Sequence, residues 1–358
     1  MSTTIMTILD VISNNLRRSQ KKSLAVIIES LLQGSQASLA DIARGMGQKT
    51  RFGSRLKRVW RYVSNSNINP EHVSADLLAW FIGRLGPDEP LVLLVDWSKF
   101  YNDHVLAAAI PLGKRAVPVF WEIATDEGLE RGQNTIEYKF FNQLRDLIPK
   151  AVPVIIVADR GFGRTELFVR LDKLGLGYII RVKDAVWVES KCWQGVIANY
   201  PLKLGQIIQW EGVKYQKRRK YKLNLVMRND IVRNTASAWY LASNVPEQAV
   251  YLLERYESRM WIEEMFCDLK SSNFKFNQVR LNSPERRSRL MIAICLATLL
   301  ATVIGLKYIN EKDYTFVEAN GRKGQLGFSI FKVGMQALKH LGDAILETVW
   351  LPLLEPVT

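Results

Sequence analysis

The chain has 358 residues, of which 48% are hydrophobic, so it is long and apolar enough for two or three domains with sizeable cores. Lysine and arginine number 49 against 35 acidic residues, and the net charge is +14 at pH 7. Such an excess favours a polyanionic partner, most often nucleic acid, although charge alone also fits a merely basic soluble protein. Three widely spaced cysteines, Cys192, Cys267 and Cys295, form no CxxC motif, which argues against a zinc site or a disulfide framework.

Two apolar stretches could be mistaken for membrane or export signals. The N-terminus is not typical of a signal peptide, because Asp10 interrupts its apolar part and the basic residues follow that part. Residues 290–306 carry no charge, but this single segment is at the lower edge of a membrane span and follows the basic sequence ERRSR. We therefore expect a buried helix, no membrane association and a cytoplasmic protein.

The first 85 residues have helical periodicity. A helix is expected over 38–47, with a serine cap, followed after a short turn by a basic helix over 50–65. This arrangement is typical of a helix-turn-helix DNA reader, and the alternative is a helical bundle with a basic surface. The candidate DNA-binding side chains of the basic helix are Arg51, Arg55, Lys57, Arg58 and Arg61.

From residue 90 the pattern changes to apolar strands that alternate with helices. The expected order is strands at 91–100, 105–114 and 115–128, a helix at 135–150, a strand within 152–164, a helix at 165–175 and a strand at 178–184. This order predicts an α/β fold with a mixed sheet and helices on its faces.

Residues 185–235 interrupt that alternation, and their Val, Ile, Trp and Tyr content favours short strands in an inserted β-rich segment. A strand at 237–246 and one long helix over 247–272 follow. The predicted domains are 1–85 (helical, DNA-binding), 86–184 with 236–285 (catalytic core), 185–235 (insertion) and 286–358 (helical).

Three acidic residues have comparable placements along this α/β region. Asp96 and Asp159 come at the ends of apolar strands, and Glu263 is on the helix that returns after the insertion. A buried carboxylate is costly unless it is paired or binds a metal, and carboxylate oxygens are ligands for hard cations such as Mg²⁺. Each aspartate alone would equally suit a loop or cap position after a strand.

The stretch 256–270 carries a second polar pattern. At about 100° per residue, Tyr256, Arg259, Glu263 and Lys270 fall on one face of a continuous helix. Taken alone, this face would be interpreted as a solvated, charge-paired surface.

The spacing of these four residues resembles the Tyr-x2-Arg-x3-Glu-x6-Lys pattern of the insertion-sequence DDE transposases of the IS-four type. Asp96 after LVLLV, Asp159 in VADRGFGR and the segment RVWRYVSNSNI (58–68) are also similar to that family. The resemblance covers about residues 55–275. It implies a ribonuclease H-like mixed sheet with flanking helices, a β-rich insertion and an all-helical N-terminal DNA-binding domain.

The resemblance also implies cut-and-paste transposition through a DNA hairpin. Asp96, Asp159 and Glu263 would hold two Mg²⁺ ions, for which Mn²⁺ substitutes, and Trp239 would stack on an extruded base. The partners would be transposon-end and target DNA, with a homodimer in the DNA complex. The cytoplasmic protein would be bacterial and would join the nucleoid when it is bound to DNA. The other candidate DNA contacts are Tyr256, Arg259, Lys270, Arg160, Arg164, Lys217, Arg218, Arg219 and Lys220.

Three other functions remain open at this point. An aspartyl-nucleophile phosphohydrolase would need a second acid two residues after Asp96, where the chain has Ser98. A ribonuclease H-like endonuclease would cut DNA without strand transfer. An inactive transposase descendant would bind DNA and cut nothing.

Overall fold

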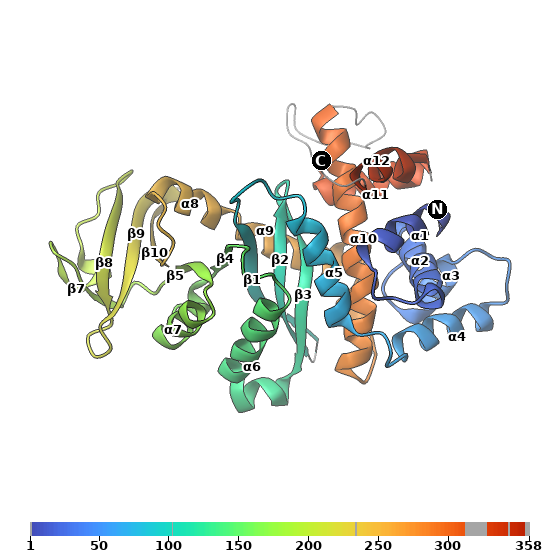
Figure 1. Ribbon diagram of the computed structural model, residues 1–358, viewed down its shortest axis with the longest axis horizontal. Helices are drawn as coiled ribbons and strands as arrows, with labels where there is room; N and C mark the ends of the chain where they lie inside the picture. The colour runs from blue at the N-terminus through green and yellow to red at the C-terminus, as the bar shows by residue number, and fades with distance from the viewer. Residues whose placement is uncertain (1, 102, 233–234, 312–327, 343, 355–358) are drawn as a thin grey trace. The chain divides into compact units, whose positions relative to one another are not determined.

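The computed structural model describes residues 2–101, 103–232, 235–311, 328–342 and 344–354. The chain forms two compact units, each built from separated stretches of sequence (Figure 1). The first unit comprises Met1–Arg84, Trp97–Gln133 and Trp261–Thr358, and the second comprises Leu85–Asp96 and Asn134–Met260. Strand β1 (Leu91–Phe100) and helix α6 (Asp126–Asp146) therefore contribute residues to both units.

The first unit begins with five helices, as the periodicity of residues 1–85 indicated. They are α1 (Ser2–Ile12), α2 (Arg18–Leu32), α3 (Leu39–Gly45), α4 (Phe52–Val63) and α5 (Pro70–Ile82). Their starts follow local chemistry: the Ser38 hydroxyl accepts the Asp41 backbone N–H at 3.1 Å, and the Asn69 side chain accepts the Glu71 N–H at 2.9 Å. The predicted helices at 38–47 and 50–65 are confirmed.

The rest of the first unit consists of a β-hairpin and a set of C-terminal helices. Its elements are β2 (Asp103–Leu112), β3 (Arg115–Thr125), α9 (Met260–Cys267), the π-turn η3 (Asp268–Ser272), η4 (Phe276–Gln278), α10 (Pro284–Glu311), α11 (Ile330–Leu341) and α12 (Ala344–Leu354). Strands β2 and β3 pair antiparallel. The strand expected over 115–128 ends at Thr125, because Asp126 begins α6, which bends at the non-helical Gly132.

Helix α10 is the central helix of the first unit. It packs against α2, α11 and β3 (Figure 1). It is also the one described helix that is long and apolar enough to cross a membrane, and 83% of its most apolar window is buried inside the protein. This burial agrees with the expected core helix.

The second unit is built on a mixed sheet with the order β1-β4-β5-β10-β9-β8-β6-β7. The strands other than β1 are β4 (Val154–Ala158), β5 (Gly177–Arg181), β6 (Trp187–Glu189), β7 (Gln194–Val196), β8 (Ile207–Tyr215), β9 (Tyr221–Val232) and β10 (Thr235–Ser243). Strands β1, β4 and β5 run parallel, and the others join antiparallel. Its helices include α7 (Thr165–Lys173) and α8 (Ala249–Glu257), with short turns η1 (Arg160–Phe162) and η2 (Ile197–Asn199).

The α/β class with a large mixed sheet is therefore confirmed, and strands β6 to β9 lie in the stretch where short strands were expected. The single helix predicted over 247–272 is wrong. The chain forms α8, a break at Ser258–Arg259, α9 and then the π-turn η3. A continuous helical wheel consequently does not describe Tyr256, Arg259, Glu263 and Lys270.

The contact between α10 and α11 gives a stability prediction. A Cβ atom on Gly305 would lie 1.9 Å from the carbonyl oxygen of Ile330, so Gly305→Ala must push the two helices apart. We expect a loss of about 1–3 kcal/mol, measured as a lower urea midpoint by circular dichroism. Gly53→Ala on α4, where a Cβ meets nothing within 4 Å, should be neutral or stabilising. Equal midpoints for the two variants would contradict this packing.

Candidate active site

Two of the predicted carboxylate residues, Asp96 and Asp159, lie at the same edge of the second unit's sheet. Strands β1 and β4 are parallel with Val95 opposite Ala158, and the next residues are Asp96 and Asp159. Because residues paired in parallel register point to the same face, both aspartates follow on the same side of the sheet. Asp159 also accepts the Gly161 backbone N–H at 2.8 Å, which fixes the turn after the strand.

Arg259 brings a guanidinium to this edge. Its Nη1 lies 3.7 Å from Oδ2 of Asp96, and the two side chains are 12% and 16% exposed. The break between α8 and α9 places it there. The Ser258 hydroxyl donates to the Arg255 carbonyl at 2.6 Å, and the Arg259 N–H donates instead to the Tyr256 carbonyl at 3.0 Å. The hydroxyl therefore replaces an α-helical partner and turns the backbone at Arg259.

Tyr256 and Trp239 form the aromatic part of the site. Tyr256 is only 3% exposed, and its ring packs edge-on against Trp239 with 5.3 Å between ring centroids. Burial raises the pKa of the Tyr256 phenol, the nearby Arg259 and Arg181 guanidinium groups lower it, and Asp159 raises it. The phenol is therefore a neutral hydrogen-bonding group close to two cations and one carboxylate.

Arg181 is a site residue that the sequence analysis missed. Its guanidinium lies 5.9 Å from the centroid of the Trp239 ring and donates to the Ala238 carbonyl at 3.3 Å. Arg181 ends β5, the strand next to β4, so it reaches the same edge as Asp159. A basic residue at the end of an apolar strand, in YIIRVKD, was the available signal.

Glu263 and Lys270 belong to the first unit. Glu263 is exposed on α9, and Lys270 lies in η3 with its ammonium 5.1 Å from the centroid of the Phe100 ring. Arg115 of β3 anchors this segment: its Nη1 donates to Glu264 at 2.9 Å, and its Nε lies 3.7 Å from Asp268. Glu264, the residue after Glu263, is thus hydrogen-bonded to the β2–β3 hairpin.

The site has the donor chemistry for a hard divalent cation but, among the described residues, no group of three or more His, Cys, Asp or Glu side chains is arranged to hold a metal ion. Asp96 and Asp159 supply carboxylate oxygens at one edge of the sheet, and this is the ligand type that Mg²⁺ prefers. The residues of the second unit therefore fit part of a magnesium site.

The basic side chains of helix α4 and its first flanking residue fall into two groups. Arg51, Lys57 and Arg61 are exposed. Arg55 instead donates to the Met46 carbonyl at 2.7 Å, and Arg58 donates to the Lys22 carbonyl at 2.8 Å. Arg58 is nevertheless exposed, whereas Arg55 is half-buried.

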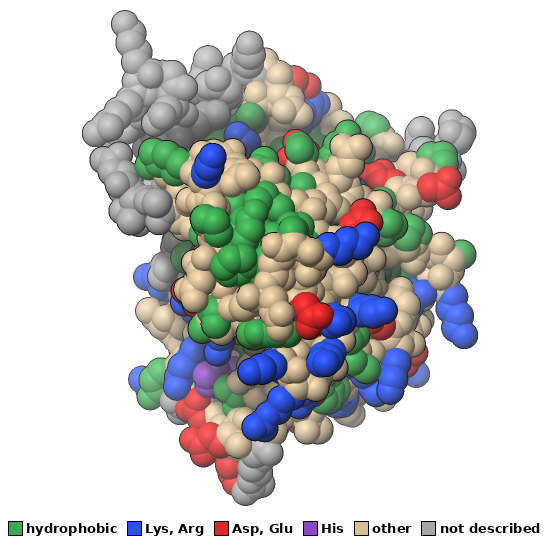
Figure 2. Space-filling view, turned by 90° about the vertical axis from the view of Figure 1, so that its left-hand side faces the viewer, with side chains coloured by type: hydrophobic (Ala, Val, Ile, Leu, Met, Phe, Trp, Pro, Cys, Tyr) green, Lys and Arg blue, Asp and Glu red, His purple; other side chains and the backbone are tan. Residues whose placement is uncertain are grey.

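The other predicted DNA contacts lie in the second unit. Arg160 is exposed in η1, whereas Arg164 pairs with the buried Glu137 and donates to the Gly161 carbonyl. The basic run from Lys217 to Lys220 forms the turn between β8 and β9, and Arg219 pairs with Glu166 at 2.5 Å. Figure 2 looks onto the face with the outer strands of this unit and shows lysine and arginine side chains gathered toward its lower part.

Comparison with known families covers the region that carries most of these residues. Residues 129–300 match the transposase DDE domain. The matched DDE domain spans just under half of the chain and contains Asp159, Arg259 and Glu263, whereas Asp96 precedes it. A comparison with curated proteins finds no match. The match supports a transposase function, which implies DNA as the partner.

We expect Asp268, which is half-buried next to Arg115, to make the stability depend on pH. Burial raises the pKa of its carboxyl to about 6, against the opposing effect of Arg115. Because the folded-state pKa lies above the unfolded value, the folded protein holds this proton more tightly, and the associated stability is lost as pH rises from about 4 to about 6. Asp268→Asn should remove this loss, worth up to about 3 kcal/mol.

Thermal unfolding of the wild type and Asp268→Asn between pH 4 and 8 measures this effect. The difference in unfolding temperature between the two proteins should change from about pH 4 to about pH 6 and should be constant above that range. Glu254→Gln, at an exposed position on α8, is the control and should follow the wild type. A constant gap between wild type and Asp268→Asn at all pH values would contradict the assignment.

Proposed function

We propose that this chain is a DNA transposase of the IS-four type that moves an insertion sequence by cut-and-paste transposition. In this proposal the second unit's sheet is part of a ribonuclease H-like core, and helices α1 to α5 form a DNA-binding domain. The observation that carries the proposal is the pairing of Val95 with Ala158, which sends Asp96 and Asp159 to one sheet edge beside Arg259. The DDE domain match over residues 129–300 supports it independently.

Asp96, Asp159 and Glu263 would be the ligands of two Mg²⁺ ions, or of Mn²⁺ in their place. When bound, these ions would lower the pKa of an attacking hydroxyl and stabilise charge on the leaving oxygen. Glu263 is exposed on α9. Arg259 can offer two parallel N–H donors to a phosphate.

The reaction would proceed through phosphodiester exchange. Water attacks the phosphorus at the transposon end, the P–O3′ bond breaks, and the products are a 3′-hydroxyl and a 5′-phosphate. That 3′-hydroxyl attacks the opposite strand, whose own 3′ oxygen leaves, and a hairpin end results. Water reopens the hairpin, and the regenerated 3′-hydroxyl attacks target DNA. The Tyr256 hydroxyl and the Lys270 ammonium would bind backbone phosphates during these steps.

A hairpin requires a sharp bend at the transposon end, which an extruded base would relieve. Trp239 would stack on that base. Trp239 is partly exposed, and its ring lies next to Tyr256 and to the Arg181 guanidinium. Stacking on an aromatic ring is tolerant of base identity and is worth about 1–3 kcal/mol per base.

The complete reaction joins two transposon ends to one target, so we propose a homodimer on DNA. Exposed basic side chains of α4 and of the turn between β8 and β9 would bind DNA backbone, as would Arg160. We place the protein in the bacterial cytoplasm, without membrane association.

The principal test uses a supercoiled plasmid that carries the gene with its flanking DNA. Wild-type protein with Mg²⁺ or Mn²⁺ should excise the element at discrete positions and give hairpin-ended product on a denaturing gel. Asp96→Asn and Glu263→Gln should each reduce excision by at least about a hundredfold, since each removes a ligand for the cation. EDTA should abolish excision, and added Mg²⁺ should restore it.

Glu254→Gln is the matched control and should excise normally, because it changes an exposed carboxylate on α8. Scattered nicking without hairpins, lost in Glu263→Gln, would instead favour a ribonuclease H-like endonuclease. DNA binding without cleavage by the wild type would identify an inactive transposase descendant. Full activity of Asp96→Asn would overturn the assignment of Asp96 as a metal ligand at this edge of the sheet.

The division within α4 predicts different effects for two arginines. Arg61→Ala should lower the slope of log K against log salt concentration by about 1 for duplex DNA, because an exposed phosphate contact is lost. Arg55→Ala should leave the slope unchanged and lower the unfolding midpoint, since Arg55 binds the Met46 carbonyl. Fluorescence anisotropy at several salt concentrations measures the slopes. Identical slopes for wild type and Arg61→Ala would exclude α4 from the interface.

A further inference from the structure

Glu137 is a buried carboxylate that the proposed mechanism does not use. It lies on α6, on the same buried face as Phe140, Phe141 and Leu144, and its side chain is 1% exposed. A carboxylate in such a position is costly unless it is paired. Its partner is the Arg164 guanidinium, which is 19% exposed. Because apolar side chains can often replace a buried ion pair without loss of stability, stability alone is a weak reason for this pair.

Arg164 holds two groups at once. Its Nη2 pairs with Glu137, and its Nη1 donates to the Gly161 carbonyl at 3.2 Å. A guanidinium can do this because its N–H donors are fixed in one plane, whereas a lysine ammonium is a point charge on a flexible stem. The Gly161 carbonyl belongs to η1, the turn that directly follows Asp159. The buried carboxylate on α6 therefore fixes the arginine, and the arginine fixes the turn.

The same turn orients the Asp159 carboxylate. Oδ1 of Asp159 accepts the Gly161 N–H at 2.8 Å, so the residue whose carbonyl is held by Arg164 also holds the carboxylate. The other end of the turn is fixed as well. The buried Tyr215 hydroxyl donates to the Gly163 carbonyl at 3.2 Å, and a Cβ atom on Gly163 would lie 2.8 Å from a carbonyl oxygen at the end of β5. The turn is thus packed closely against the sheet.

We propose that Glu137 and Arg164 are positioning residues for Asp159. Glu137 orients the Arg164 guanidinium, Arg164 fixes the Gly161 carbonyl, and the Gly161 N–H holds the Asp159 carboxylate at the sheet edge. Because a metal ligand must stay within about 0.5 Å of its productive position, a looser turn weakens cation binding. The proposal rests on the proposed function in taking Asp159 as a ligand of Mg²⁺ or Mn²⁺. It gives Arg164 a role other than the DNA contact expected from the sequence.

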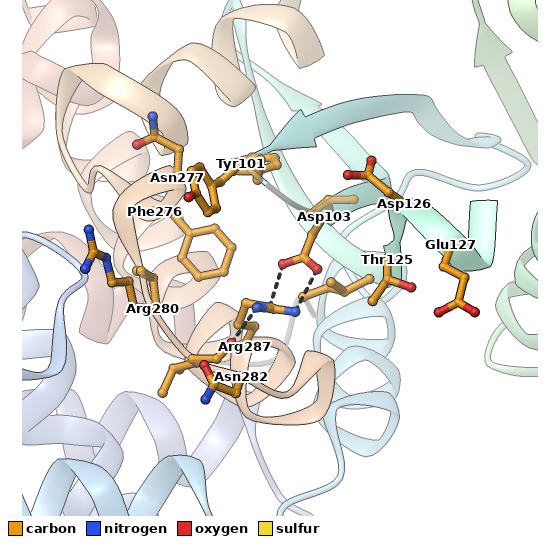
Figure 3. Close-up of a pocket in the computed structure, with 15 residues that line it drawn as sticks. Tyr101, Asp103, Thr125, Asp126, Glu127, Phe276, Asn277, Arg280, Asn282 and Arg287 are labelled. Carbon is orange, nitrogen blue, oxygen red and sulfur yellow. Dashed lines mark hydrogen bonds and ion pairs between the residues drawn. The ribbon is translucent and has the colours of Figure 1, made fainter. Parts of the chain in front are cut away.

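A second ion pair of similar construction supplies a matched control. In the first unit, Arg287 of α10 donates to Asp103 at 2.7 Å and also donates to the Leu281 carbonyl, at the side of a cavity (Figure 3). Its two side chains are 15% and 9% exposed, close to the values for the pair in the second unit. Arg287→Lys therefore removes the same kind of contact and leaves the turn after Asp159 unchanged.

The first test is amide hydrogen exchange of the full-length protein in EDTA, measured by mass spectrometry on peptides that cover residues 159–164. Arg164→Lys keeps a cation beside Glu137 but cannot hold the Gly161 carbonyl at the same time. Exchange in the turn should become about tenfold faster, because one charge-assisted hydrogen bond is lost. Arg287→Lys should exchange as the wild type does in these peptides. Equal exchange of wild type and Arg164→Lys would overturn the positioning role.

The second test is the binding of Mn²⁺ alone, without DNA, measured from the electron paramagnetic resonance signal of the free ion. Arg164→Lys should bind Mn²⁺ about tenfold more weakly, as expected when the support of a metal ligand is lost. Asp159→Asn should weaken binding at least as much, and Arg287→Lys should bind as the wild type does. Wild-type affinity in Asp159→Asn would place the ion elsewhere and remove the proposal.

A double variant separates positioning from core packing. Glu137→Gln alone would leave a nearly buried guanidinium without this counter-charge and would destabilise the fold, so it is a poor test. Glu137→Leu combined with Arg164→Met replaces both charges with apolar side chains and should keep a urea midpoint close to that of the wild type. Its turn should nevertheless exchange fast, and its Mn²⁺ affinity should be about tenfold lower. Wild-type Mn²⁺ affinity in this variant would reduce the pair to core packing.

The two proposals fail in different ways. Normal plasmid excision by a protein whose turn exchanges equally in wild type and Arg164→Lys would remove the positioning role and leave the transposase. Faster turn exchange and weaker Mn²⁺ binding in Arg164→Lys, in a protein that excises nothing, would keep the positioning role and remove the transposase.

Discussion

The register between β1 and β4 is the constraint on which the candidate site depends. In this register Val95 lies opposite Ala158, and two carboxylates follow at the same edge of the sheet. A slip of one residue would turn one of the two aspartates to the opposite face of the sheet. The register is secured by the apolar side chains on both strands, since Leu93, Leu94, Ile156 and Val157 are fully buried. The packing of the core thus determines where the charges are placed.

At the same edge of the sheet, the fold holds several charged and polar side chains close together. Tyr256 is buried against Trp239, yet two guanidinium groups and a carboxylate lie close to its hydroxyl. One pair of opposite charges lies there, since Arg259 approaches Asp96. Such an arrangement keeps side chains oriented before DNA arrives, which lowers the entropy cost of binding.

Much of the fold was predictable because it follows from patterns that one sequence contains. The buried strands carrying Asp96 and Asp159 were recognisable as continuous apolar runs, and Ser38 marked a helix start. The break at Ser258–Arg259 was not predictable from periodicity, because it depends on whether a serine hydroxyl takes the Arg255 carbonyl. Arg181 was missed because its role depends on which strand lies beside β4. Likewise, the charge pattern of α4 could not separate Arg55, which binds a carbonyl, from the exposed Arg61.

The discontinuous make-up of the first unit has a consequence for the protein during its synthesis. Helix α2 packs on α10, but α2 starts at Arg18 and α10 starts only at Pro284. At a translation rate of about 5–20 residues per second, the apolar face of α2 waits roughly 10–50 s for its partner. Meanwhile the strands of the second unit emerge from the ribosome. During that time the nascent chain exposes an unfinished apolar surface, and such surfaces are prone to aggregation.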